Sequence, residues 1–169
     1  AENESVENPG AINLLNALKI SGRDKDGLGI GFLNAITEKT MATVSNDDND
    51  DTRQIVVSPL TNYNVMVFDQ RFNQNSSVTF INTNVTRNGS FRDANVTGLL
   101  FDLNNKTNTY NLSGGLKSSS INDVENKNGY NASLFFAENS GKFRYSLGSE
   151  YVSKDFDIND LGINFRTNY

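Results

Sequence analysis

The residues best suited to chemistry form an acidic run at positions 46–51, which contains Asp47, Asp48, Asp50 and Asp51. Clustered carboxylates are ligands that a hard cation such as Ca²⁺ prefers. The run lacks the central glycine and the distal glutamate of an EF-hand loop. A solvated acidic loop is therefore the favoured interpretation, with a weak Ca²⁺ site as the alternative, and no other cofactor is expected.

Other kinds of catalytic site have little support. The chain has no His, no Cys and no Trp, which excludes His-based catalysis, the usual zinc sites and disulfides. Carboxylates such as Asp102 and Glu150 could form a glycosidase pair, but neither lies in a recognisable motif. Gly29 and Gly31 are spaced as in a nucleotide-binding loop, but the third glycine and the helix are missing. We therefore do not expect an enzyme.

Charge and composition limit the partners. The net charge is −5 and no basic cluster is present, which argues against binding to nucleic acid. No apolar run approaches the roughly 18 residues of a membrane helix. Seven Asn-X-Ser/Thr triplets permit a glycoprotein interpretation. In four of them the two polar residues flank an apolar one, as they would along a strand with one polar face.

These side chains must be positioned by strands, and the hairpin Ala94–Lys117 shows the pattern best. We predict two arms joined by a four-residue turn, Asn104–Thr107. Alternate side chains of a strand point to opposite faces, so each arm has one apolar and one polar face.

Similar alternation along the chain predicts about nine antiparallel strands, preceded by a flexible lead-in at residues 1–10. A helix is the alternative for the first strand, because Leu14, Leu15 and Leu18 also fit helical spacing. Besides the two arms of the hairpin, the predicted strands are Ile12–Ser21, Leu28–Thr37, Gln54–Phe72, Ser77–Arg87, Tyr130–Ala137, Phe143–Tyr151 and Leu161–Tyr169.

The pattern favours a lipid solvent for the apolar faces. They span about 8–10 residues, close to the 9–11 that a tilted strand needs to cross a bilayer. Aromatic residues gather near strand ends, and short turns alternate with longer loops at 38–53, 118–128 and 154–160. The fold class predicted is an all-β, antiparallel transmembrane β-barrel over residues 11–169, part of a larger barrel and without a second domain. A soluble secreted β-sandwich is the alternative.

A barrel interpretation assigns individual side chains to the two faces. The predicted lumen-lining residues are Lys19, Asn95, Thr97, Asn111, Ser113, Lys117, Asn131, Ser133, Arg144, Glu150 and Arg166. The predicted lipid-facing residues are Val96, Leu100, Leu112, Leu116, Leu134, Phe136 and Leu147.

Several stretches resemble a known family: SPLTNYNV and FDINDLGINFRTNY are the more specific, and LKISGRDKDGLGIGFLNAITE and ANVTGLLFDL are consistent with it. The sequence is similar to the barrel region of an uncharacterised outer-membrane family of Bacteroidota. The resemblance covers most of residues 11–169 and implies an N-terminal domain similar to family-nine carbohydrate-binding modules, which is not in this sequence. It also implies further strands, because bacterial barrels have even strand numbers. An eight-strand chain that ends on the aromatic Tyr169 is the alternative.

The resulting functional expectation is an outer-membrane barrel segment with a polar lumen that serves passage or docking of a solute, and the carbohydrate-binding-like domain that the resemblance implies associates this role with glycans. Short turns would be periplasmic and long loops extracellular. The expected partners are lipid and either missing strands of the same chain or another barrel protein, including the assembly machinery that could hold an incomplete barrel. A soluble adhesin-like binding module is the alternative function.

Overall fold

The computed structural model describes residues 4–46 and 51–160, and this part of the chain is all-β. It contains no helix that is long and apolar enough to cross a membrane. The strands are β1 Glu4–Glu7, β2 Leu14–Arg23, β3 Leu28–Thr37, β4 Thr40–Asn46, β5 Thr52–Ser58, β6 Thr61–Phe72, β7 Ser76–Arg87, β8 Asp93–Asn104, β9 Tyr110–Asn122, β10 Lys127–Glu138 and β11 Tyr145–Val152.

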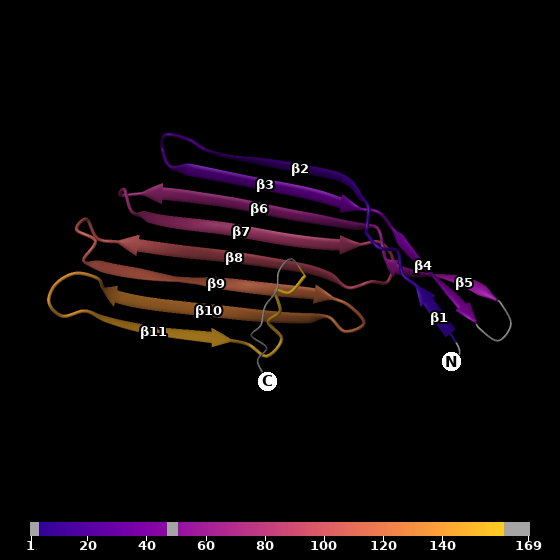
Figure 1. Ribbon diagram of the computed structural model, residues 1–169. Helices are drawn as coiled ribbons and strands as arrows, with labels where there is room; N and C mark the ends of the chain where they lie inside the picture. The colour runs from indigo at the N-terminus through magenta and orange to yellow at the C-terminus, as the bar shows by residue number, and fades with distance from the viewer. Residues whose placement is uncertain (1–3, 47–50, 161–169) are drawn as a thin grey trace.

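The strands form two antiparallel sheets. The large sheet has eight strands in the order β11-β10-β9-β8-β7-β6-β3-β2, and the small sheet has the order β1-β4-β5 (Figure 1). Apart from the excursion into the small sheet, the large sheet is a meander in which chain neighbours are also spatial neighbours. Its described end strands, β2 and β11, are not paired with each other, so no closed barrel is observed.

The small sheet extends the hairpin formed by β3 and β6. Thr37 pairs with Thr61 in the large sheet, and Thr40 pairs with Ser58 directly beyond it. Pro59 has no N–H to donate to a ladder, and it lies at this interruption. The hairpin therefore continues past the large sheet, where β1 adds a third strand to it (Figure 1).

The strand and loop predictions are confirmed in most places and wrong in four. β3 has the predicted bounds, and residues 14–23 form a strand rather than a helix. The predicted strand Gln54–Phe72 is divided at Pro59, and the lead-in and the loop at 38–53 contain strands β1 and β4. The predicted loop at 118–128 shrinks to residues 123–126 because β9 and β10 are longer than expected. The predicted strand Leu161–Tyr169 lies outside the described residues.

Cross-strand pairs give the large sheet two distinct faces, since paired residues lie on the same side. We call one the apolar face. It is defined by the register row Ile30, Phe68, Phe80, Leu99, Leu116, Ala132 and Tyr151.

The opposite side, which we call the strapped face, is crossed by the segment after β11. We call this segment, residues 153–160, the strap. Tyr130 O accepts a hydrogen bond from Ser153 N, and Ser119 Oγ accepts one from Asp157 N at 3.0 Å. The strap thus passes from β10 towards β9 in front of the sheet (Figure 1). The buried residues of the large sheet gather on this face and include Val85, Ala94, Ser119 and Ile121.

The register of the β8–β9 hairpin contradicts one sequence prediction. Asn104 pairs with Asn111, so even-numbered residues of β8 share a face with odd-numbered residues of β9. Val96 and Leu100 therefore lie on the strapped face, whereas Leu112 and Leu116 lie on the apolar face. An even number of residues connects Asn104 with Asn111, so an even-numbered residue always pairs with an odd-numbered one. The sequence prediction had placed even-numbered residues of both arms on the same face.

Candidate functional site

The apolar face is the most unusual surface of the molecule. Leu116 is 63% exposed and Leu147 75% exposed, while Leu99 and Leu134 are also exposed on the same face. The accessible surface of the chain is 11884 Å², against about 8,300 Å² expected for a compact monomer of this mass. Large apolar patches of this kind mark contact with another molecule or with lipid.

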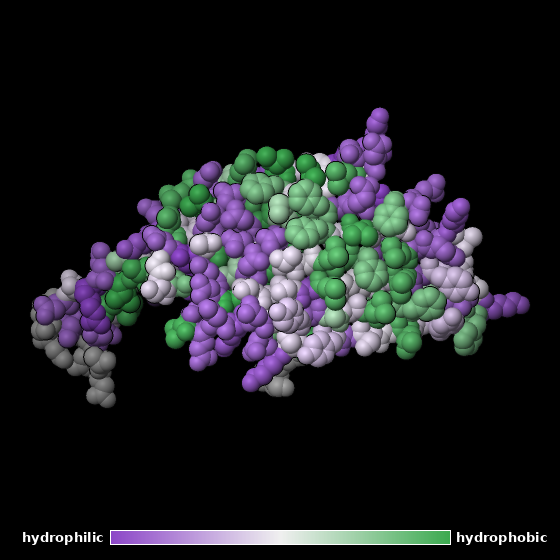
Figure 2. Space-filling model, turned by 180° about the vertical axis from the view of Figure 1, so that it is seen from behind, coloured by the Kyte–Doolittle hydropathy of each residue, from purple (hydrophilic) through white to green (hydrophobic). Residues whose placement is uncertain are grey.

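The apolar side chains do not cover the whole face. Figure 2 shows hydrophobic side chains on the right and upper parts of this face and hydrophilic ones towards the small sheet on the left. Further along the same strands, moving away from the short turns, amide side chains replace the apolar ones. One register row contains Asn34, Asn64, Asn84, Asn95 and Ser120.

These amides bond to one another, and we call them the amide belt. Asn34 Nδ2 donates to Asn62 Oδ1 at 2.7 Å and to Asn64 Oδ1 at 2.8 Å. Asn82 Nδ2 donates to Thr97 Oγ1 at 2.8 Å and to Asn95 Oδ1 at 3.2 Å. The belt thus satisfies much of its own hydrogen bonding and gives the apolar band a sharp boundary.

The structure places those predicted lumen-lining residues that it describes in three different settings. Asn95 and Thr97 lie on the apolar face as part of the amide belt, which corrects their assignment to the face of Asn111 and Ser113. Arg144 lies in the turn before β11, and Arg166 lies outside the described residues. The predicted residues found together on the strapped face are Lys19, Asn111, Ser113, Lys117, Asn131, Ser133 and Glu150.

The predicted lipid-facing set divides in the same way. Val96 and Leu100 belong to the strapped face, as described above. The residues of the set found together on the apolar face are Leu112, Leu116, Leu134, Phe136 and Leu147.

Side chains on the strapped face lie flat against glycines of neighbouring strands. A Cβ at Gly115 would come within 2.5 Å of Leu100, and one at Gly148 within 2.1 Å of the Phe135 ring. The missing Cβ atoms make room for these side chains close to the sheet. The strapped face is therefore partly filled by its own side chains.

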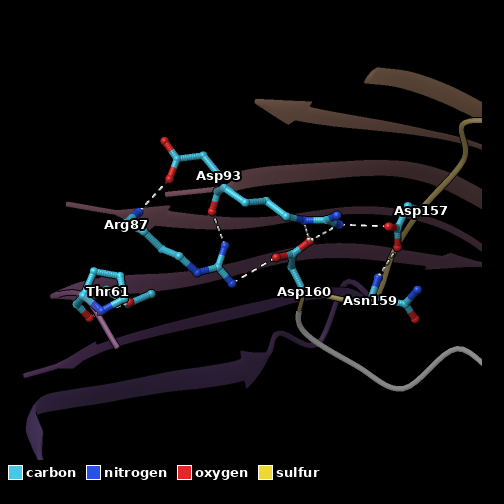
Figure 3. Close-up of polar contacts among 8 residues, drawn as sticks. Thr61, Arg87, Asp93, Asp157, Asn159 and Asp160 are labelled. Atoms are coloured by element: carbon cyan, nitrogen blue, oxygen red, sulfur yellow. Dashed lines mark hydrogen bonds and ion pairs between the residues drawn. The ribbon is translucent and has the colours of Figure 1, made fainter. Parts of the chain in front are cut away.

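An ion-pair cluster fastens the strap to the loop between β7 and β8 (Figure 3). Arg92 Nη2 lies 2.7 Å from Asp160 Oδ2 and 2.8 Å from Asp157 Oδ2, and Arg87 Nη2 lies 2.9 Å from Asp160 Oδ1. The Asp160 side chain is only 10% exposed, and Arg87 also bonds the carbonyl of Arg92. One carboxylate thus bridges two arginines.

The charges of the cluster shift two pKa values. The hydrogen bond with Asp160 raises the pKa of Arg92, and Asp157 adds to this effect against partial burial. Burial acts to raise the pKa of Asp157, but hydrogen bonds from Arg92 and from the Asn159 backbone outweigh it and lower the pKa. Both shifts favour the charged forms of Arg92 and Asp157. Nothing in the sequence pattern indicated it, because the partners lie 65 or more residues apart.

A second charged group lies at the short-turn end of the strapped face. Asp69 forms an ion pair with Arg23 and accepts a hydrogen bond from Thr79 Oγ1 at 2.7 Å. Arg23 also donates to Gly27 O at 2.6 Å, which ties the turn before β3 to the wall. These residues satisfy one another's charges and hydrogen bonds, so we interpret the group as a structural support for the turn.

No metal centre emerges among the residues that are described. They contain no group of three or more His, Cys, Asp or Glu side chains that could hold an ion. Of the acidic run, only Asp51 belongs to the described part, and Asp47, Asp48 and Asp50 lie outside it. The suggested Ca²⁺ site therefore stays a sequence prediction.

Comparison with known proteins gives one match. No curated protein and no solved structure matches the chain. The model of a family described as a domain of unknown function (DUF5916) matches residues 1–169. The chain, with its exposed apolar sheet and strapped reverse face, therefore belongs to this family.

Proposed function

We propose that the chain is a wall segment of an outer-membrane β-barrel, with the apolar face towards lipid and the strapped face towards the lumen. The observation that carries the proposal is the register row from Ile30 to Tyr151, which is apolar on all seven strands from β3 to β11. An alternation of this kind, apolar outward and polar inward, is the pattern of outer-membrane strands.

The stagger of the strands supports the same proposal. The row crosses β3 two residues from its turn end at Leu28, β8 five residues from Asn104, and β11 six residues from Tyr145. The short turns step in one direction across the sheet, as Figure 1 also shows. A sheet closes into a barrel only when its register is staggered in this way.

The proposal extends to orientation and role. The turns at 24–27 and 73–75 would face the periplasm, and the projecting small sheet would lie outside the cell. We assign no catalysis to the chain. Its role would be docking or passage of a hydrophilic solute along the strapped face, in a barrel of the Bacteroidota type that the sequence resembles, with further strands or the barrel-assembly machinery as partners.

The height of the apolar band favours a second candidate, a soluble secreted binding module. On β8 the band runs only from Leu99 to Leu103 before Thr97 and Asn95 begin the amide belt. A strand that crosses a bilayer needs about 9–11 residues. In a soluble module the apolar face would instead be covered by a second apolar surface.

Single cysteines distinguish the two candidates, because the sequence has none of its own. We would place an environment-sensitive fluorophore at Leu116→Cys on the apolar face or at Ser133→Cys on the strapped face, in the full-length protein in native-like vesicles. We expect brominated lipids to quench the Leu116 label and to leave the Ser133 label unaffected. Equal quenching at both sites, including none at either, would falsify the membrane proposal. If the protein is also monodisperse in detergent-free buffer, the result would support the soluble module.

A further inference from the structure

The strap is held to the strapped face at three places. At its start, Ser153 N donates to Tyr130 O at 2.8 Å, and Tyr130 N donates to Ser153 Oγ at 2.8 Å. In its middle, Asp157 N donates at 3.0 Å to the hydroxyl of Ser119, a residue that is fully buried. At its end, the ion pairs of Asp160 fix it to the loop between β7 and β8 (Figure 3). The strap therefore spans the strapped face from β10 over β9 to the loop that precedes β8.

The register shows the level at which the strap crosses the sheet. Ser119 pairs with Gly129 on the strapped face. On the other face, Ser118 and Ser120 pair with residues of the amide belt, so the strap lies directly behind this belt. The strap forms no strand. Because irregular backbone is tolerated at membrane depth only inside protein or along a water-filled cavity, its position fits a lumen on this side of the sheet.

The charges of the strap fall into two groups. Asp157 and Asp160 both contact Arg92, and their side chains are only 31% and 10% exposed. Lys154 and Asp155 carry the remaining charges, and both residues are exposed. The strap is therefore anchored by one pair of carboxylates and presents one cation and one anion to solvent.

We propose that the strap is the constriction of the solute passage along the strapped face, with Lys154 and Asp155 at its rim. Asp160 is then a positioning residue, which holds the strap in place through Arg87 and Arg92. This inference rests on the proposed membrane function and names the part of the lumen that selects solutes. The width of a pore and the charges that line it decide which solutes pass.

Modification of a single cysteine tests the constriction. We would record single-channel currents of the full-length protein in planar lipid bilayers and treat Asp155→Cys with a trimethylammonium methanethiosulfonate. The added group should roughly halve the conductance, because passage depends on pore width. Leu116→Cys, on the apolar face, is the control and should keep its conductance. Unchanged conductance of Asp155→Cys, with the modification verified by mass, overturns the proposal.

Charge exchange tests the rim. In a salt gradient, Asp155→Lys should shift the reversal potential towards anion selectivity, and Lys154→Glu should shift it towards cation selectivity. A segment that only braced the wall would not change this potential. Lys142→Glu, in the turn before β11, makes the same change of charge away from the strap and should have no effect. Equal shifts in the two glutamate variants, or no shift in either, contradict the proposal.

Release of the strap tests the role of Asp160. Asp160→Asn should accelerate hydrogen exchange of residues 153–160 and raise the conductance roughly 1.5-fold, because the passage widens. Gly129→Val, whose side chain must displace the strap, should do the same. Asp69→Asn breaks the ion pair with Arg23 on the same face and should leave the conductance unchanged. Faster exchange without a rise in conductance contradicts the proposal, and so does unchanged exchange in both strap variants.

The two proposals fail in different ways. Bromolipid quenching at Leu116→Cys reports the membrane proposal and does not depend on the strap. If quenching persists while the wild-type protein carries no current, or while the strap variants leave the current unchanged, the strap proposal alone is wrong. If quenching is absent, the membrane proposal is wrong, and the strap proposal with it.

Discussion

The two faces of the large sheet are built from the same eight strands but differ in how they are covered. The apolar face leaves Leu116 and Leu147 exposed, and the strapped face buries Val85 and Ile121. The first ends in amides that bond to one another, and the second is crossed by a chain segment held by ion pairs. The described chain therefore covers only the strapped face. The apolar face has no cover within the described residues.

A charge on the apolar face should produce the largest effect. Leu116→Lys places an ammonium in the middle of the band, which in an outer-membrane barrel destabilises by roughly 2–4 kcal/mol near the bilayer centre. Urea unfolding in lipid vesicles measures this change. Lys117, the next residue, carries the same charge on the strapped face, so Lys117→Leu serves as the control. A loss below about 0.5 kcal/mol for Leu116→Lys would show that the face does not meet lipid.

A side chain beneath the strap should have the next largest effect. A Cβ at Gly129 would come within 2.2 Å of Phe156 Cα and N, so Gly129→Val must displace the strap. Overpacking of this kind costs about 1–3 kcal/mol. Faster trypsin cleavage after Lys154 should accompany the loss. Gly22→Val is the control, since nothing lies within 4 Å of a Cβ there, and equal effects at both sites would contradict the described packing.

Loss of the bridging carboxylate should weaken the strap more mildly. Asp160→Asn removes the charge that Arg87 and Arg92 share, and hydrogen bonds to charged groups contribute about 1.5–3 kcal/mol. Because Arg92 keeps Asp157, we expect the lower end of this range. Hydrogen exchange of residues 153–160 should accelerate. Asp155→Asn, at an exposed position of the strap, should leave exchange unchanged.

Acid should release the same contact. The pKa of Asp157 is lowered in the folded chain, so its contribution to stability is complete above the unfolded pKa of about 4. That contribution is lost as the pH falls through the lowered folded value. Exchange of the strap at pH 3, corrected for intrinsic rates, should exceed that at pH 6. The difference should shrink in Asp157→Asn, and an unchanged difference would assign the pH response to another group.

Breaking the amide belt should have the smallest effect. Asn82→Ala removes donors to Asn95 and Thr97 at a half-buried site, which should cost about 0.5–1.5 kcal/mol. Thr86→Ala, which donates only to Asn84, is a suitable comparison and should cost less. Chemical denaturation measures both. Equal losses of stability in the two variants would show that the connected hydrogen bonds of the amide belt add no stability beyond that of an isolated one.

The comparison of the two faces also explains what the sequence could predict. Alternation located β3 correctly, because Leu28, Ile30 and Phe32 alternate with Gly29 and Gly31 directly after a clear turn. The phase of β8 could not be read in this way, since Val96 and Leu99 are both apolar and only the connection length decides between them. The sequence did not predict β4, because its residues adjoin an acidic run that indicated a loop.

The strap shows a different limit. Arg92 and Asp160 are 68 residues apart, and neither lies in a strand whose pattern could indicate a partner. Their contact depends on the path of the chain after β11, which turns across the sheet where Gly129 leaves room for Phe156. Local periodicity in the sequence predicts the strands of the sheet, whereas the position of the strap depends on contacts between distant residues.

The interrupted hairpin has a consequence for reach. From Thr40 to Asn46, β4 adds seven residues beyond the end of β3, or roughly 23 Å at the rise of a strand. Pro59 separates this extension from the ladder below, and Glu4 braces it through a bidentate contact with Arg53 at 2.6 and 3.0 Å. A molecule that binds near the tip of this extension would therefore be held at a distance from the end of the large sheet.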